Sequence, residues 1–242
     1  MKVPGVLYLV PTPLGELLCA ETLPMPVIST VAALDYLVAE NPKSARAFLK
    51  AVDALVPLKR LLQDIEVVRL DVSTSPETLP LLLAPICDGR DGALLSEAGC
   101  PAVADPGALL VRLAHQSGVR VRPLVGPSSI LLALMASGLE GQRFRFNGYL
   151  PVEAGARAAS LKALEKDSAT NSCTQIFIET PYRNGPLLET CIKVLRPDTM
   201  LCVATDLTLA TETIVSQFVL RWRDAPRPEL KSRPSIFLTL AK

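Results

Sequence analysis

Short apolar runs rich in β-branched residues alternate along the chain with longer segments in which apolar residues recur at helical spacing. This alternation predicts a mixed α/β fold with parallel strands, and it argues against a β-sandwich or a helical bundle. We predict strands over 6–10, 34–39, 67–70, 93–96, 119–124, 144–149, 174–179, 200–205, 212–218 and 235–240. Helices are predicted over 42–56, 76–87, 106–116, 128–137, 155–166 and 184–195, and Gly118 is expected to end the third of them.

The chain length and the point where this pattern restarts predict two lobes. The chain has 242 residues, of which 49% are hydrophobic and 20% charged, so it exceeds a typical domain of about 100 to 150 residues and can bury a sizeable core. The pattern begins again after Gly126-Pro127. We therefore expect α/β lobes at residues 1–122 and 123–242.

Composition excludes several classes of protein. The longest apolar run, 130–136, is far shorter than the roughly 18 residues that span a bilayer, and the N-terminal residues lack a signal-peptide pattern. The six cysteines form no C-x-x-C pair and none adjoins the single histidine, so neither a zinc site nor a redox motif is indicated. We expect a cytoplasmic protein that uses no membrane and no metal.

The charge is nearly balanced, with 25 basic and 24 acidic residues, which argues against a protein that binds nucleic acid over its whole surface. Residues 1–125 carry a formal charge of −2 and residues 126–242 carry +3. The basic residues of the second half are consistent with solvated loops and strand edges, or with a weakly basic binding face.

Three turns rich in Gly and Pro follow predicted strands, over 11–16, 96–107 and 125–129. Small residues in the second turn allow the backbone to approach a ligand, and Ser128 and Ser129 stand at a predicted helix N-terminus. Open α/β sheets bind ligands at the carboxyl ends of their strands. None of the three turns carries the G-x-G-x-x-G or G-x-x-x-x-G-K-[ST] pattern of common nucleotide-binding folds.

These turns, together with residues 146–151 (FNGYLP) and 179–183 (ETPYR), resemble the motifs of the tetrapyrrole methylase superfamily. The order of the motifs and the residues in them are most similar to those of its ribosomal RNA branch, the small-subunit ribose 2'-O-methyltransferase I family. The resemblance implies a class III S-adenosylmethionine-dependent methyltransferase, a homodimer of two-lobed α/β chains with the cofactor cleft between the lobes. Its product would be S-adenosylhomocysteine.

The resemblance also implies which residues bind the cofactor, each carried over from a matching motif position. Pro13 would lie on the first turn at the cofactor, and the methionine end would be lined by Ala98, Gly99, Cys100 and Val103. The sugar or carboxylate would lie near Ser128 and Ser129, the adenosine side near Glu179, and the adenine near Leu207 and Thr208. Cys100 would line the site as a small residue and would not act as a nucleophile.

Several positions depart from the family pattern. Glu16 replaces the usual Asn, residues 41–44 replace an acidic and arginine-containing helix entry, and residues 71–74 replace a stretch that contains His. Tyr182 stands where the family's Ser-Pro-His-Arg segment has His. These changes affect the substrate side of the family pattern more than its cofactor side.

Transfer of a methyl group from a sulfonium requires alignment and exclusion of water, and a hydroxyl acceptor benefits from a general base. Among Glu16, Glu97, Asp105 and Glu179 we select Glu97 as the base, and we expect Arg183 and Lys43 to contact phosphate. The expected partner is ribosomal RNA or the small ribosomal subunit, methylated at a ribose 2'-hydroxyl. Methylation of a tetrapyrrole or another small molecule, or a non-catalytic paralogue that binds the cofactor, are the alternatives.

Overall fold

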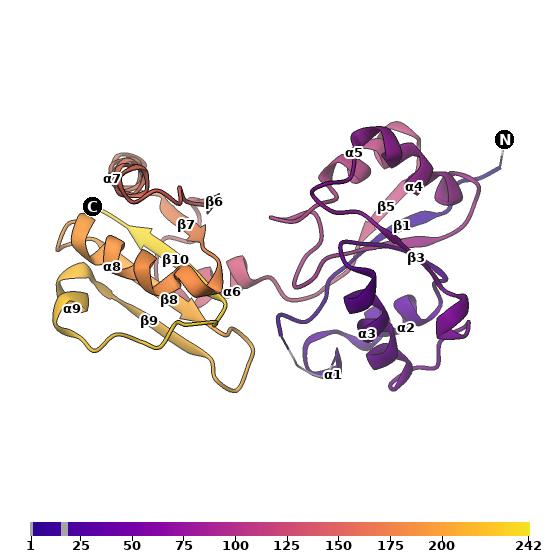
Figure 1. Cartoon of the computed structure of the whole chain (residues 1–242), viewed down its shortest axis with the longest axis horizontal. Helices are drawn as coiled ribbons and strands as arrows, with labels where there is room; N and C mark the ends of the chain where they lie inside the picture. The colour runs from indigo at the N-terminus through magenta and orange to yellow at the C-terminus, as the bar shows by residue number, and fades with distance from the viewer. Residues whose placement is uncertain (1, 16–18) are drawn as a thin grey trace. The chain divides into compact units, whose positions relative to one another are not determined.

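The protein is described by a computed structural model over residues 2–15 and 19–242, and its chain divides into two compact units, Met1–Ser128 and Ser129–Lys242 (Figure 1). The expected boundary at residues 122 and 123 falls instead inside strand β5 (Arg120–Pro123). This strand pairs with β1 (Val6–Val10), so it belongs to the first unit. Glu16 lies outside the described residues.

The first unit is built on a parallel sheet with the strand order β3-β2-β4-β1-β5. Because these strands run in the same direction, the turns that follow them meet at one edge, which we call the first carboxyl edge. The remaining elements of this unit are β2 (Tyr36–Ala39), β3 (Glu66–Arg69), β4 (Gly92–Leu95), α1 (Cys19–Thr22), α2 (Met25–Ala32), α3 (Pro42–Asp53), α4 (Leu79–Cys87), α5 (Ala108–Gln116), η1 (Leu62–Asp64) and η2 (Pro76–Thr78).

Helices cover both faces of the first sheet. Leu37 of β2 packs in a core with α2 and α3, whereas the next residue, Val38, packs in a core with α4 and α5. The two pairs of helices therefore lie on opposite faces of the sheet (Figure 1). Burial on both faces explains why β2 and β4 are continuous apolar runs in the sequence.

The second unit contains a mixed sheet with the order β6-β7-β10-β8-β9. Strands β6 (Phe144–Tyr149) and β7 (Thr174–Ile178) are parallel, while β10 (Ser235–Leu240) runs antiparallel to both β7 and β8 (Met200–Thr205). Strand β9 (Thr213–Phe218) is antiparallel to β8, because a short loop without a crossover helix joins them. The expectation of parallel strands is thus confirmed for the first sheet and wrong for part of the second.

Strands β6, β7 and β8 of the second unit end at the same side of their sheet, which we call the second carboxyl edge. The core beneath it contains Trp222, which is fully buried and donates from Nε1 to the Leu201 carbonyl at 3.0 Å. The rings of Phe177 and Phe237 stack across β7 and β10 with centroids 5.8 Å apart. The helices of this unit are α6 (Ser129–Ser137), α7 (Ala154–Asn171), η3 (Pro181–Arg183), α8 (Asn184–Val194) and α9 (Val219–Asp224).

Most predicted elements are confirmed, and 144–149, 200–205 and 235–240 match the observed strands end to end. The helix predicted from residue 106 begins instead at Ala108, because Gly107 with φ 126° occupies its N-cap. Helix α2 was not predicted from its pattern of Pro and β-branched residues, which have low helix propensity. It forms because Val27, Ile28 and Val31 are buried beneath the sheet.

Over residues 2–15 and 19–242, no helix combines the length and apolar character needed to cross a bilayer. The same residues contain no group of three or more His, Cys, Asp or Glu side chains placed to hold a metal ion. All six cysteines lie in the described part of the chain and are free thiols.

Candidate functional site

The turns after β1 and β4 are joined at the first carboxyl edge by a two-way backbone bridge. Thr12 and Gly99 each donate a backbone N–H to the other's carbonyl, both at 3.0 Å. The Thr12 hydroxyl also donates to the Ser96 carbonyl, and the Ser96 hydroxyl donates to the Gly99 carbonyl. Strands β1 and β4 are neighbours in the sheet, so the order of the strands brings these turns together.

The turn after β5 is held against the other two by close packing at glycine. A Cβ at Gly126 would lie 2.2 Å from Cγ of Pro11, so no larger residue fits there without displacing the first turn. The Cys100 thiol donates to the Pro127 carbonyl at 3.4 Å. The three turns predicted from the sequence therefore form one structure at this edge.

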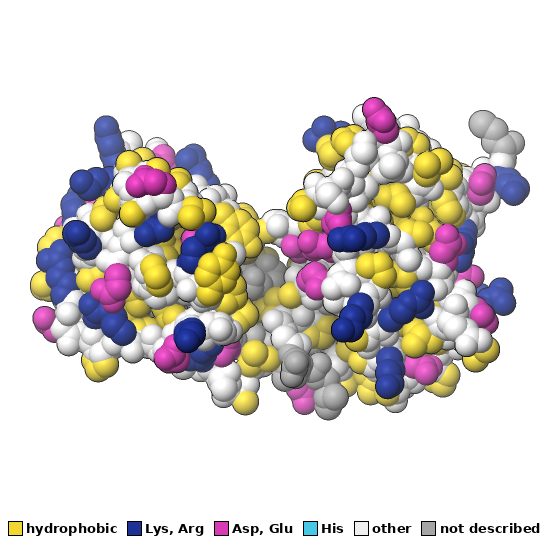
Figure 2. Space-filling view, viewed as in Figure 1, with side chains coloured by type: hydrophobic (Ala, Val, Ile, Leu, Met, Phe, Trp, Pro, Cys, Tyr) yellow, Lys and Arg dark blue, Asp and Glu magenta, His cyan; other side chains and the backbone are white. Residues whose placement is uncertain are grey.

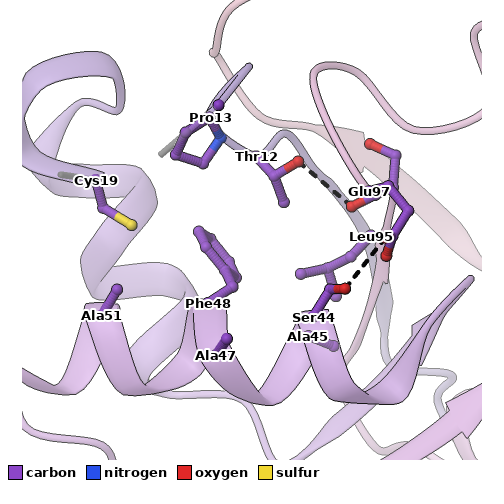
Figure 3. Close-up of a pocket in the computed structure, with 12 residues that line it drawn as sticks. Thr12, Pro13, Cys19, Ser44, Ala45, Ala47, Phe48, Ala51, Leu95 and Glu97 are labelled. Atoms are coloured by element: carbon purple, nitrogen blue, oxygen red, sulfur yellow. Dashed lines mark hydrogen bonds between the residues drawn. The ribbon is translucent and has the colours of Figure 1, made fainter. Parts of the chain in front are cut away.

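A cavity of about 230 Å³ opens beside these turns and is bounded on its other side by α3 (Figure 3). It is lined by polar groups of the turns and by small or apolar side chains: Thr12, Pro13, Gly15, Cys19, Ser44, Ala45, Ala47, Phe48, Ala51, Leu95, Ser96 and Glu97. Ligand sites usually measure about 300 to 1,000 Å³. This cavity is therefore suited to one part of a larger ligand.

Four carboxylates gather around the same edge. Burial, and then the charges of Glu97 and Asp71, raise the pKa of Glu40. Burial, and then Glu40 and Glu97, raise the pKa of Asp105 to about 6. Asp71 differs, because hydrogen bonds, first from the Ser73 side chain, lower its pKa. The edge is acidic, so it favours a ligand that carries positive charge.

Glu97, the predicted base, is exposed at the start of the turn after β4. Its Oε2 accepts a hydrogen bond of 3.1 Å from the hydroxyl of Ser44 in the first turn of α3 (Figure 3). This contact fixes one carboxylate oxygen and leaves the side chain open to solvent. Lys43, the predicted phosphate contact, directly precedes Ser44 in the sequence and is exposed.

The other residues predicted in the first unit occupy the same turns. Pro13 lines the cavity, and Gly99 is buried in the bridge with φ 76°. Val103 is 49% exposed, and its backbone N–H donates to the Cys100 carbonyl. Burial raises the pKa of the Cys100 thiol, which keeps it protonated and supports its assignment as a lining residue. Ala98 is exposed beside Glu97, and Ser128 ends the first unit.

A second group of predicted residues lies at the second carboxyl edge. Glu179 is buried at the end of β7, where Oε1 accepts from Thr180 and from Arg183, the latter at 2.6 Å. Hydrogen bonds from Arg183 and Thr180 outweigh its burial and lower the pKa of Glu179. Arg183, the other predicted phosphate contact, is therefore paired with a carboxylate, and 26% of its side chain is exposed.

Leu207 and Thr208 belong to the loop after β8 at the same edge. Arg233 holds this loop through a 2.7 Å ion pair with Asp206, and the Asn184 amide donates to the Arg233 carbonyl. The loop is thus joined to the start of α8, next to the Glu179 segment. Ser129, the last predicted residue, begins α6 of this unit.

Left-handed backbone conformations concentrate at both edges. Of the six non-glycine residues with positive φ in the described chain, Ala102 and Ala104 lie in the turn after β4, and Asp206 and Thr208 lie in the loop after β8. Each such residue costs about 1 to 3 kcal/mol, and such strain persists mainly at functional sites. At the second edge, Oε2 of Glu179 and Oδ1 of Asn184 are buried acceptors with no partner among the described residues.

Sequence reasoning missed residues that only the fold brings to the first edge. Thr12, Ser44 and Glu40 come from separate segments, and none of them was selected from the sequence as a site residue. Thr12 and Ser96 were visible only as polar positions within Gly- and Pro-rich turns. Both hold the turns after β1 and β4 together, and they can do so only because β1 and β4 are adjacent in the sheet.

Comparison with known proteins gives consistent matches over most of the chain, although no family model matches it. The chain is 34% identical over 210 residues to the ribosomal RNA small subunit methyltransferase I of Escherichia coli O157:H7, covering 87% of this chain and 68% of that protein. It is 30% identical over 220 residues to the protein of the same name from Haemophilus influenzae, covering 91% and 72%.

Solved structures with a similar fold include the methyltransferase CobJ, with a TM-score of 0.63, 17% identity, and coverage of 98% of this chain and 94% of that one. The cobalt precorrin-4 methyltransferase CbiF matches with a TM-score of 0.60, 18% identity, and coverage of 97% and 94%. At this identity the matches establish the fold.

Replacement of Gly126 by Ala should destabilise the first unit by about 1 to 3 kcal/mol, because the new methyl group collides with Pro11. Gly141→Ala is the matched control, since a Cβ there meets open space and should change stability by less than about 0.5 kcal/mol. Urea unfolding followed by far-UV circular dichroism measures both variants. Equal midpoints for the two variants would contradict the packing described here.

Asp105→Asn should stabilise the protein at pH 7 by about 3 kcal/mol, and this gain should vanish near pH 4. The folded pKa of about 6 exceeds the ordinary value of 3.8, so ionisation costs the native state stability as the pH rises from about 4 to 6. Urea unfolding at several pH values, with the exposed Asp88→Asn as control, measures this. A gain independent of pH would contradict the shift.

Proposed function

Since the chain belongs to the ribosomal RNA small subunit methyltransferase I family, we propose that it transfers the methyl group of S-adenosylmethionine to RNA of the small ribosomal subunit. The observation that carries this proposal is the match at 34% identity over 87% of the chain. The fold shared with CobJ and CbiF, whose printed descriptions are methyltransferases, agrees with methyl-transfer chemistry.

The first carboxyl edge would bind the methionine end of the cofactor. Backbone groups around Gly99 and Cys100, with Pro13, Ala98 and Val103, provide close approach and polar contacts for a zwitterion. The acidic surroundings complement the cationic sulfonium and ammonium groups. S-adenosylhomocysteine lacks the sulfonium charge, so the acidic edge would attract this product less strongly than S-adenosylmethionine. The weaker attraction would assist release of the product.

The second carboxyl edge would bind the adenosine end, through Glu179, Leu207 and Thr208. The unpaired Oε2 of Glu179 is a buried acceptor that suits a hydroxyl or amino donor of a ligand. Leu207 is 7% exposed and contributes an apolar surface. Ser128 and Ser129, at the start of α6, would contact the sugar or the carboxylate.

The acceptor we propose is a ribose 2'-hydroxyl, with Glu97 as the general base. When bound, S-adenosylmethionine would supply the methyl group to the hydroxyl oxygen, and the Glu97 carboxylate would accept the hydroxyl proton. Glu97 is accessible to a substrate, and Ser44 holds one of its oxygens. Lys43 would contact an RNA phosphate near this edge. The family resemblance further supports a homodimer that acts in the cytoplasm.

Purified protein should bind S-adenosylmethionine and S-adenosylhomocysteine with micromolar dissociation constants, worth about 8 kcal/mol, and should methylate isolated small subunits. If the acceptor is the ribose 2'-oxygen, the adjacent phosphodiester will resist alkaline hydrolysis, because its internal nucleophile is blocked. ATP, NAD and large subunits are the negative controls. Binding of the cofactor without transfer to small subunits would redirect the search to small-molecule acceptors.

Glu97→Gln should lower kcat about 10²- to 10⁴-fold and leave cofactor affinity within about threefold, since the amide cannot accept the proton. The exposed Glu77→Gln in η2 is the matched control and should retain wild-type kcat. Single-turnover methyl transfer to small subunits measures the chemical step. A fully active Glu97→Gln enzyme would remove Glu97 from the mechanism.

A further inference from the structure

Two exposed tyrosines follow adjacent parallel strands at the second carboxyl edge. Tyr149 ends β6 and is 59% exposed, and Tyr182 lies in η3 directly after β7 and is 68% exposed. Strands β6 and β7 are adjacent and parallel, with Tyr149 opposite Ile178. Tyr149 and the segment that carries Tyr182 therefore lie at the ends of neighbouring strands.

Arg183 connects the two rings to the buried part of the edge. Its guanidinium lies over the Tyr182 ring, 5.3 Å from the centroid, and donates to Glu179 at 2.6 Å. The Glu179 hydrogen bond raises the pKa of Arg183 most, and Tyr182 and Tyr149 raise it further. One face of the Tyr182 ring is thus occupied by a fixed cation, while most of the side chain stays exposed.

We propose that Tyr149 and Tyr182 form a stacking platform for an unpaired nucleotide of the RNA substrate, with Arg183 as the residue that positions the Tyr182 ring. This inference rests on the proposed function and assigns the substrate's base to a surface of the second unit.

The chemistry of the surface favours a nucleobase. An exposed aromatic ring stacks on the flat face of any base, and such contacts are worth about 1 to 3 kcal/mol per base. Sequence-specific RNA recognition depends mainly on unpaired bases, because paired bases are stacked within the helix. The ring is held in place by Arg183 and Glu179 before a substrate binds, so little side-chain freedom is lost on binding.

The distribution of charge supports the same assignment. The second unit carries 14 Lys and Arg against 11 Asp and Glu, whereas the first carboxyl edge is surrounded by Glu40, Asp71, Glu97 and Asp105. The excess of basic residues in the second unit attracts a polyanion more strongly than the carboxylates of the first edge do. Figure 2 shows Lys and Arg side chains interspersed with hydrophobic side chains on the visible face of that unit.

The test uses the 242-residue chain and a short fluorescent oligoadenylate ribonucleotide, compared with an RNA duplex of the same length. Tyr182→Ala and Tyr149→Ala should each weaken binding of the single strand about 10-fold, equivalent to about 1.4 kcal/mol. Tyr182→Phe should bind within twofold of wild type, because stacking does not need the hydroxyl. The matched control is Phe218→Ala, whose ring is 45% exposed at the end of β9, opposite the start of β8, and should have no effect.

Two further measurements separate stacking from other roles. In methyl transfer to small subunits, the alanine variants should raise KM more than they lower kcat. Their affinity for S-adenosylhomocysteine, measured by calorimetry, should equal that of wild type. A loss of S-adenosylhomocysteine binding would assign the rings to the cofactor and overturn the proposal. Equal loss in Tyr182→Phe and Tyr182→Ala would overturn it too, because the hydroxyl would then be the contact.

The outcomes also distinguish failure of the stacking platform from failure of the proposed methyl transfer to small subunits. If wild-type protein methylates small subunits and the alanine variants bind RNA as tightly as wild type, only the stacking platform is wrong. If wild-type protein binds the cofactor but transfers no methyl group to small subunits, the proposed function fails first.

Discussion

The backbone bridge between Thr12 and Gly99 is the interaction on which the first carboxyl edge depends. It joins two turns that are far apart in the sequence of the first unit into one short antiparallel pair, and the packing of Gly126 on Pro11 adds the third turn. Without these contacts the turns would be long flexible loops that must pay a large ordering entropy when a ligand binds. With them, the backbone groups that would face a ligand are fixed beforehand.

The two carboxyl edges differ in how their charged side chains are arranged. Carboxylates collect at the first edge, where burial, and then repulsion between the carboxylates, raise the pKa of Glu40 and Asp105. The second edge instead contains ion pairs, Glu179 with Arg183 and Asp206 with Arg233, which hold exposed loops in fixed positions. The two edges therefore differ in local charge, although the chain as a whole carries a nearly balanced charge.

The structure explains what the chain's departures from the family pattern do at residues 71–74, at Pro42 and at Tyr182. Residues 71–74 form a compact turn in which Asp71 accepts hydrogen bonds from Ser73 and Thr74, so this segment is stable without its usual histidine. Pro42 begins α3 behind Asn41, which accepts from the backbone of Lys43 and caps the helix. Tyr182 replaces a histidine with a larger exposed ring. The first two changes preserve local structure, and the third changes the surface.

The sequence by itself determined the α/β alternation, the positions of most strands and the three turns at the first edge, because burial periodicity and Gly and Pro conformations are local properties. It could not determine that the second sheet is mixed, that the first unit extends to Ser128, or that α2 is helical, since these depend on strand order and on burial against distant residues. Tertiary structure alone decided that Ser44 donates to Glu97, that the charge of Glu40 acts on Asp105, and that Arg183 lies over Tyr182. A hydrogen bond or a pKa depends on distances between side chains, and only the folded chain fixes those distances.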